Sequence, residues 1–139
     1  QTTRVTGDIR ALTPRQLVLA QKSMVKIANE NLAETSAELV FHEGYPPMAL
    51  TSGNKDLLAL YNRVSLDLGF GEVTAVDPRK AGAADISFVA EYVEMAIDGL
   101  GLMGSGGHTK DELADMSTLN QQTSRAALLL HRLANQPPN

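Results

Sequence analysis

The sequence lacks several residue types on which whole classes of function depend. It has no cysteine and no tryptophan, and aromatic residues make up 4% of its 139 positions. The absence of cysteine excludes disulfides, thiolate metal sites and a cysteine nucleophile. A formal net charge of -4, without a basic stripe, argues against a nucleic-acid interface. No apolar run approaches the roughly 20 residues that a membrane-spanning helix needs.

The residues that are present indicate a mixed globular chain. Hydrophobic residues make up 43% of the sequence, which is enough for a packed core. The chain starts at Gln1 without a methionine or a signal segment, and a predicted strand follows within a few residues. We therefore expect a processed product or a fragment, with further polypeptide upstream.

The first predicted helix has a strong start signal. Thr13 is a capping residue, Pro14 suits the first helical position, and Gln16 can reach back to the cap as in a capping box. Apolar residues then recur at helical spacing, which predicts a helix to about Asn31.

Further helices are predicted in the second half of the chain. An apolar stripe over residues 57–68 is closed by Gly69, Asp85 is the natural cap of a short helix, and Ser117 is expected to cap the last helix. The buried stripe expected on that last helix consists of Leu119, Thr123, Ala126, Leu130 and Leu133.

Short apolar or alternating segments between these helices predict strands. They cover residues 4–12, 37–42, 73–76 and 93–97. Alternating strands and helices indicate α/β or α+β layers. The tandem Pro46–Pro47 cannot lie in a central strand and is the best candidate for a domain boundary.

A glycine-rich segment follows the last predicted strand. Residues 99–104 match the dinucleotide fingerprint G-x-G-x-x-G, but Ser105–Gly107 cannot continue into the helix that this fingerprint requires. The glycines are better interpreted as backbone that must approach something closely. His108 ends this segment and could be a metal ligand or a loop-capping surface residue.

Other polar residues are weaker candidates. Glu112 could share a helical face with His108, although a solvated acid is the simpler interpretation. Arg10 could hold a carboxylate bidentately, pair with Asp8, or be a solvated charge at a strand edge. His42 and His131 lie in ordinary surface contexts, and we do not expect either to be a ligand.

Four segments together resemble the C-terminal part of the zinc-dependent peptidase family M-twenty. They are Gly7–Arg10, Gly82–Asp85, Asp98–Glu112 and Gln121–Ala127, in the order that the family has them. This family includes glutamate carboxypeptidase, acetylornithine deacetylase and succinyl-diaminopimelate desuccinylase, and the glutamate carboxypeptidase branch looks closest.

The resemblance implies an α/β fold class. Residues 1–47 would be the second half of an α+β, ferredoxin-like lid or dimerisation domain, and residues 48–139 the C-terminal part of a mixed-sheet zinc-hydrolase catalytic domain. His108 is similar to the family's last zinc ligand and Arg10 to its carboxylate-gripping lid arginine. Gly82 stands where a family turn offers backbone to the substrate, although the turn here reads Gly-Ala-Ala-Asp.

The family's other metal ligands and its general-base glutamate have no counterpart in this sequence. One histidine cannot hold a catalytic zinc ion, which needs about three protein ligands. The resemblance therefore implies a dinuclear-zinc amidohydrolase or carboxypeptidase that is complete only with an N-terminal part. Its substrate would be a small peptide or an N-acyl amino acid, and it would form a homodimer through the lid. The alternative is a non-catalytic dimerisation or interaction remnant of the family. Under either interpretation the compartment could be the cytoplasm or the periplasm.

Overall fold

The first helix begins where the sequence predicts it. In the computed structural model, which describes residues 2–80 and 84–135, α1 spans Pro14–Ala28. The Gln16 N–H donates to Thr13 Oγ1 at 3.2 Å, and Gln16 Oε1 accepts the Leu12 N–H at 3.0 Å. The predicted cap at Thr13 is confirmed, whereas the Gln16 side chain reaches back to the N–H of Leu12 and not to that of the cap residue. The helix ends at Ala28, short of the predicted Asn31.

The second helix has well-defined caps at both ends. Helix α2 spans Ser52–Asp67, and the Thr51 side chain accepts the Asn54 N–H. Gly69 has φ +74° and its N–H donates to the Leu66 carbonyl, while the N–H of the next residue donates to the Ser65 carbonyl at 2.9 Å. These two bonds form a Schellman motif, so the predicted C-terminal glycine is confirmed.

The last helix is correctly predicted in position but not in its buried face. Helix α3 spans Leu119–Ala134 and follows the short 3-10 helix η3, Met116–Thr118. The cap position of α3 is Thr118, which makes no side-chain capping bond, and Asp115 caps η3 by accepting the Ser117 N–H, so the expected cap at Ser117 is wrong. The buried residues of α3 are Gln122, Arg125 and Leu129, whereas the predicted stripe members Leu119 and Leu130 are 43% and 66% exposed.

The expected short helix after residue 84 forms as two 3-10 segments. They are η1, Asp85–Phe88, and η2, Ala90–Tyr92. Ala84 occupies the cap position, and Asp85 lies in the first turn instead of capping it. Its carboxylate accepts a hydrogen bond from the Tyr45 hydroxyl at 3.0 Å.

The predicted strands do not pair with one another. Among the described residues the only sheet is the antiparallel pair β1, Gly104–Ser105, and β2, Leu113–Ala114. Residues 4–12, 37–42, 73–76 and 93–97 belong to no strand, since a strand exists only where a neighbour supplies the complementary backbone groups.

Two amide side chains of α2 take the place of such a neighbour. Asn62 Oδ1 accepts the Val73 N–H and Asn54 Oδ1 accepts the Ala96 N–H, each at 2.8 Å. Residues 73–76 and 93–97 are thus each bonded to a side chain of α2 and not to a sheet. The mixed-sheet fold class stays a prediction.

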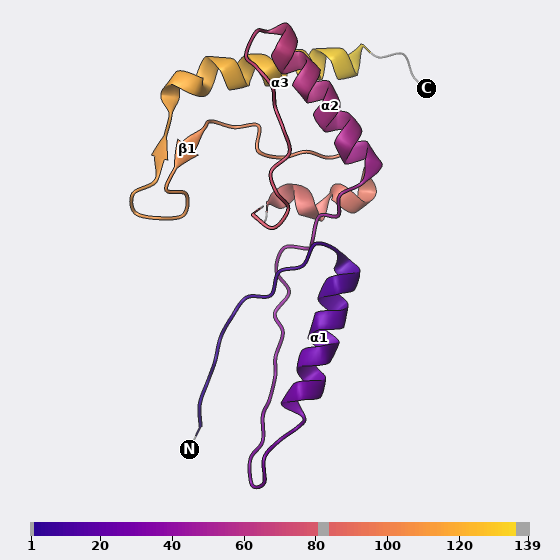
Figure 1. Cartoon of the computed structure of the whole chain (residues 1–139), viewed down its shortest axis with the longest axis vertical. Coiled ribbons are helices and arrows are strands. Elements are labelled where there is room, and N and C mark those ends of the chain that lie inside the picture. Colours follow the sequence, from indigo (N-terminus) through magenta and orange to yellow (C-terminus); the bar gives the residue numbers. More distant parts are fainter. Residues whose placement is uncertain (1, 81–83, 136–139) are drawn as a thin grey trace. The chain divides into compact units, whose positions relative to one another are not determined.

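The chain divides into two units, of residues 1–50 with 76–93 and of residues 51–75 with 94–139. The boundary expected at residues 47/48 stays a prediction. In the second unit α2 packs on α3, as the upper part of Figure 1 shows, and encloses the hydrophobic core. The core residues are Leu57, Leu60, Tyr61, Val64 and Leu129.

The first unit encloses little apolar surface. Helix α1 has no buried residue, and its Val18, Leu19 and Ile27 are 46%, 54% and 67% exposed. Figure 1 shows the helix flanked by long segments without secondary structure. Within residues 2–80 and 84–135, no helix is long and apolar enough to cross a membrane.

Candidate functional site

A small β-hairpin presents the glycine-rich segment and His108. In its register Gly104 pairs with Ala114 and Ser105 with Leu113. The base of the hairpin is anchored to the segment before α3. The Asp115 N–H donates to the Met103 carbonyl at 2.8 Å, and the Met103 N–H donates to Thr118 Oγ1 at 3.1 Å. These bonds fix the base of the hairpin to the residues just before α3.

The loop of the hairpin is held by its own hydrogen bonds. Thr109 donates to the Gly106 carbonyl twice, from its N–H at 3.1 Å and from its hydroxyl at 2.6 Å. The same hydroxyl accepts the Asp111 N–H at 3.2 Å. Gly106 has φ +67°, and a Cβ there would lie 2.7 Å from the Asp111 carbonyl oxygen, so both backbone conformation and space require glycine.

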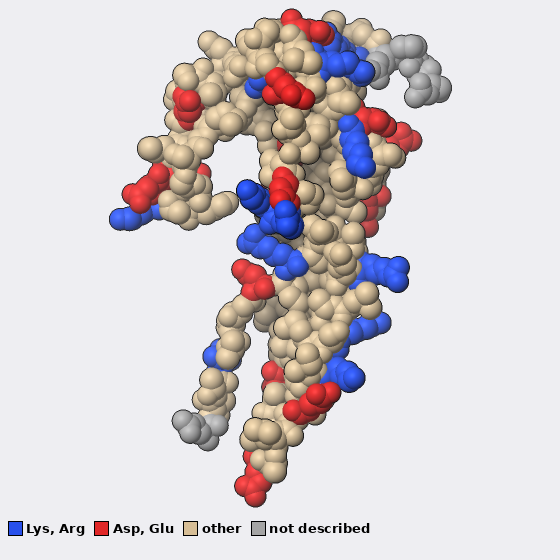
Figure 2. All heavy atoms as spheres, viewed as in Figure 1, with Lys and Arg blue, Asp and Glu red and all other residues tan. Residues whose placement is uncertain are grey.

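His108 has an unusual backbone conformation within this loop. Its φ is +63°, a left-handed value that residues with a side chain adopt rarely. Its N–H donates to Glu112 Oε2 at 3.1 Å. His108 and Glu112 are both exposed, and Figure 2 shows acidic and basic side chains together on this loop, at the left of the view.

The contact between Glu112 and His108 differs from the helical arrangement that the spacing suggested. Residues 106–112 form a loop and not a helix, because the hairpin reverses the chain there. The two residues therefore share no helical face, and the acid caps a backbone N–H instead. No sequence signal indicated this contact, because a histidine and a glutamate four residues apart suit a helix equally well.

A shallow hollow of about 410 Å³ lies along the hairpin. Its lining includes Met103, Glu112 and Leu113, so it is partly apolar and has one carboxylate at its rim. A second hollow, of about 300 Å³, lies between the segment 100–102 and α3 and is lined by Leu119, Gln122, Thr123 and Ala126. Neither hollow contains His108 in its lining.

The described residues supply at most part of a metal site. No group of three or more histidine or acidic side chains comes close enough to hold an ion within the described part of the chain. The exposed imidazole of His108 suits a zinc ion as a single nitrogen ligand, and two further ligands would have to come from elsewhere. A single imidazole can supply one ligand, and it does not make a complete zinc centre.

The remaining predicted residues lie away from this hairpin in the chain. Arg10 is exposed, in the first unit, and forms no hydrogen bond or ion pair with any residue that the structure describes, so the structure shows a solvated charge and not a pair with Asp8. Gly82 lies outside the described residues. His131, in the last turn of α3, interacts with Asn135, and His42 is exposed.

The fingerprint glycines lack the helix that the dinucleotide motif requires. Gly104 belongs to β1 and pairs with Ala114, and no helix begins between residues 99 and 115 of the described chain. The helix N-terminus that would receive a pyrophosphate is therefore missing at this place.

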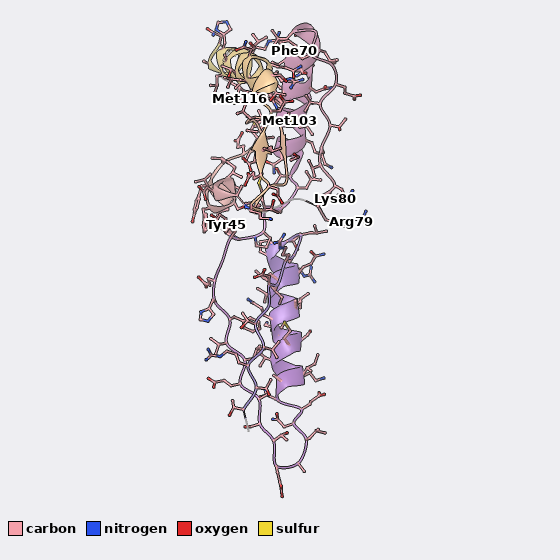
Figure 3. All side chains as sticks on the ribbon, turned by 90° about the vertical axis from the view of Figure 1, so that its left-hand side faces the viewer. Tyr45, Phe70, Arg79, Lys80, Met103 and Met116 are labelled. Atoms are coloured by element: carbon pink, nitrogen blue, oxygen red, sulfur yellow. The ribbon has the colours of Figure 1, made fainter. Side chains whose placement is uncertain are left out.

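A buried polar cluster in the α2–α3 unit was not predicted. Arg125 is 8% exposed and donates to three neutral acceptors: Ser65 Oγ at 2.9 Å, Gln122 Oε1 at 2.9 Å and the Phe70 carbonyl at 3.1 Å. Its guanidinium also lies 5.5 Å from the centre of the Phe70 ring, which Figure 3 shows beside the end of α2. Burial raises the pKa of the Tyr61 hydroxyl beside this cluster, and the charge of Arg125 lowers it in part.

Comparisons with known proteins found no match for this sequence. No family model matches the sequence, and neither a curated protein nor a solved structure matches it.

Proposed function

We propose that this chain is the C-terminal portion of a dinuclear-zinc amidohydrolase or carboxypeptidase. The reaction would cleave an amide bond next to a free carboxylate, in a small peptide or an N-acyl amino acid. What supports the proposal is the order of the four motifs in the sequence, together with one structural observation. That observation is the exposed imidazole of His108 at the tip of a hairpin loop with a fixed backbone.

In this proposal each residue has a limited role. His108 supplies one nitrogen ligand, and the bound zinc ions would polarise the scissile carbonyl and activate water. Arg10, which is exposed and has no described partner, orients the substrate through its carboxylate. Gly82 offers backbone to the substrate, and the general base comes from the N-terminal part of the polypeptide. The chain alone would be inactive.

The experiment uses the protein expressed from its natural reading frame. We expect about two zinc ions per chain and hydrolysis of N-acyl amino acids or dipeptides. The His108→Ala variant should lose zinc and activity, whereas His42→Ala, which changes an exposed histidine outside the hairpin, should keep both. A tight zinc site of full stoichiometry in residues 1–139 alone would contradict the proposal, because the other ligands should be absent there.

A second candidate is a non-catalytic module that binds a partner or a second copy of itself. The observation that favours it is the exposed apolar surface of α1, where no residue is buried. A homodimer through the first unit is a proposal under either function. The natural reading frame distinguishes the two candidate functions. If it contains no metal-ligand motifs upstream and the protein binds no zinc, the non-catalytic module explains the chain better than the hydrolase.

A further inference from the structure

We infer that Glu112 is a positioning residue for His108. Its carboxylate holds the backbone of His108 in the conformation that presents the imidazole at the tip of the hairpin loop. The inference rests on the proposed function, in which this imidazole is a metal ligand. It assigns to Glu112 a role that neither the spacing nor the resemblance provides.

Within the loop, the left-handed conformation is adopted by His108 and not by the adjacent glycine. The left-handed conformation is easily adopted by glycine, and a glycine stands at the adjacent position 107. Yet Gly107 is not among the residues with positive φ, whereas His108 has φ +63°. The chain thus places the left-handed conformation on a residue with a side chain although glycine is its neighbour. An observed outlier of this kind is grounds for a functional hypothesis.

The Glu112 carboxylate binds the backbone of His108. A carboxylate that accepts a backbone N–H forms a charge-assisted hydrogen bond, which is stronger than a bond to a neutral acceptor. Here the bond joins the His108 N–H to Glu112 Oε2 at 3.1 Å. Glu112 directly precedes β2, whose pairing with β1 restrains its backbone. The hairpin ladder is therefore linked through one side chain to the backbone of His108.

The neighbouring acid provides a matched control. Asp111 has the same charge and lies one position away, but its N–H bonds to Thr109 Oγ1 and its carboxylate makes no hydrogen bond to His108. Removing either carboxylate changes the net charge of the loop equally. Only the removal of Glu112 should release the backbone of His108.

The experiment compares Glu112→Ala, Glu112→Gln and Asp111→Ala in the protein expressed from its natural reading frame. The readouts are zinc affinity, the thermal midpoint and the hydrogen exchange of the His108 amide. We expect Glu112→Ala to weaken zinc binding roughly tenfold, as loss of a group that orients a metal ligand typically does, and to speed the exchange of the His108 amide. Asp111→Ala should match the wild type, and Glu112→Gln should recover part of the affinity because its amide oxygen can accept the same N–H.

The outcomes distinguish this inference from the proposed function. Wild-type zinc affinity in Glu112→Ala, or an equal loss in Asp111→Ala, would overturn the positioning role. If His108→Ala leaves zinc binding unchanged, the proposed function fails, and the exchange of the His108 amide then decides the positioning role alone. A fall in the thermal midpoint equal in Glu112→Ala and Glu112→Gln, with no partial recovery of zinc affinity, would indicate a merely structural carboxylate and also overturn the inference.

Discussion

Replacing Arg125 with alanine should lower the free energy of unfolding of the α2–α3 unit by about 3 kcal/mol. The guanidinium is buried and donates three hydrogen bonds, to Ser65, Gln122 and the Phe70 carbonyl. It joins α3 to the end of α2, so its loss affects the packing of the two helices as well as the polar cluster.

The size of this loss depends on which hydrogen bonds the partners of Arg125 retain in the variant. A hydrogen bond from a charged group contributes a net of about 1.5 to 3 kcal/mol, so three such bonds sum to at least about 4.5 kcal/mol before any relief of desolvation. The Ser65 hydroxyl still donates to the Gly71 carbonyl at 2.6 Å, and Gln122 still accepts from the Tyr61 hydroxyl at 3.4 Å, so only the Phe70 carbonyl loses its described side-chain donor. No acidic side chain among the described residues pairs with Arg125, and relief of its desolvation cost therefore limits the loss.

Urea unfolding followed by circular dichroism measures the change. Arg125→Met retains much of the apolar volume and removes the buried charge, so we expect a smaller loss, of about 1 kcal/mol. The control is Arg132→Ala, which removes the exposed ion pair with Asp67 on the same helices and should cost about 0.5 kcal/mol. If Arg125→Ala costs no more than Arg132→Ala, the buried cluster does not stabilise the unit and the reasoning fails.

Two further predictions concern the end of α2 and the Tyr45 hydroxyl. Gly69→Ala should destabilise the α2–α3 unit by about 1 kcal/mol in urea unfolding, because Gly69 has φ +74° and open space where a Cβ would lie, so the cost is conformational. Gly101→Ala, which has open space and no positive φ, is its control, and equal effects would contradict the explanation. The hydrogen bond to Asp85 raises the pKa of Tyr45 above 10.0, so the contribution of that bond is complete below the unfolded pKa and is lost as pH rises through the folded one. Titration of Tyr45 by NMR should show a lower pKa in Asp85→Asn, and an unchanged midpoint would contradict the assignment.

The helices could be predicted because their signals are local. The cap at Thr13 and the glycine at position 69 act on backbone groups within a few residues, and the structure confirms both. The buried face of α3 could not be predicted by apolar spacing, because Arg125 and Gln122 are buried through hydrogen bonds to α2 and its following loop. A charged residue has no apolar signature that would place it inside.

For the candidate site too, the sequence indicated some features and only the structure showed the others. The glycines and His108 mark a loop in the sequence, and their resemblance to a metal-site motif selects the histidine. The left-handed conformation of His108 and its capping by Glu112 are invisible in the sequence, because they depend on where the hairpin reverses. The spacing instead suggested a shared helical face, which the loop does not form.

By itself the sequence determined the absence of thiol chemistry, the start of α1, the glycine at the end of α2 and the choice of His108 as the candidate ligand. Only the tertiary structure decided which segments pair as strands, because hydrogen bonding between strands needs a partner that no local pattern specifies. It also decided that Arg125 lies inside and that Glu112 contacts the backbone of His108. Both depend on distances between groups that only the folded chain brings together.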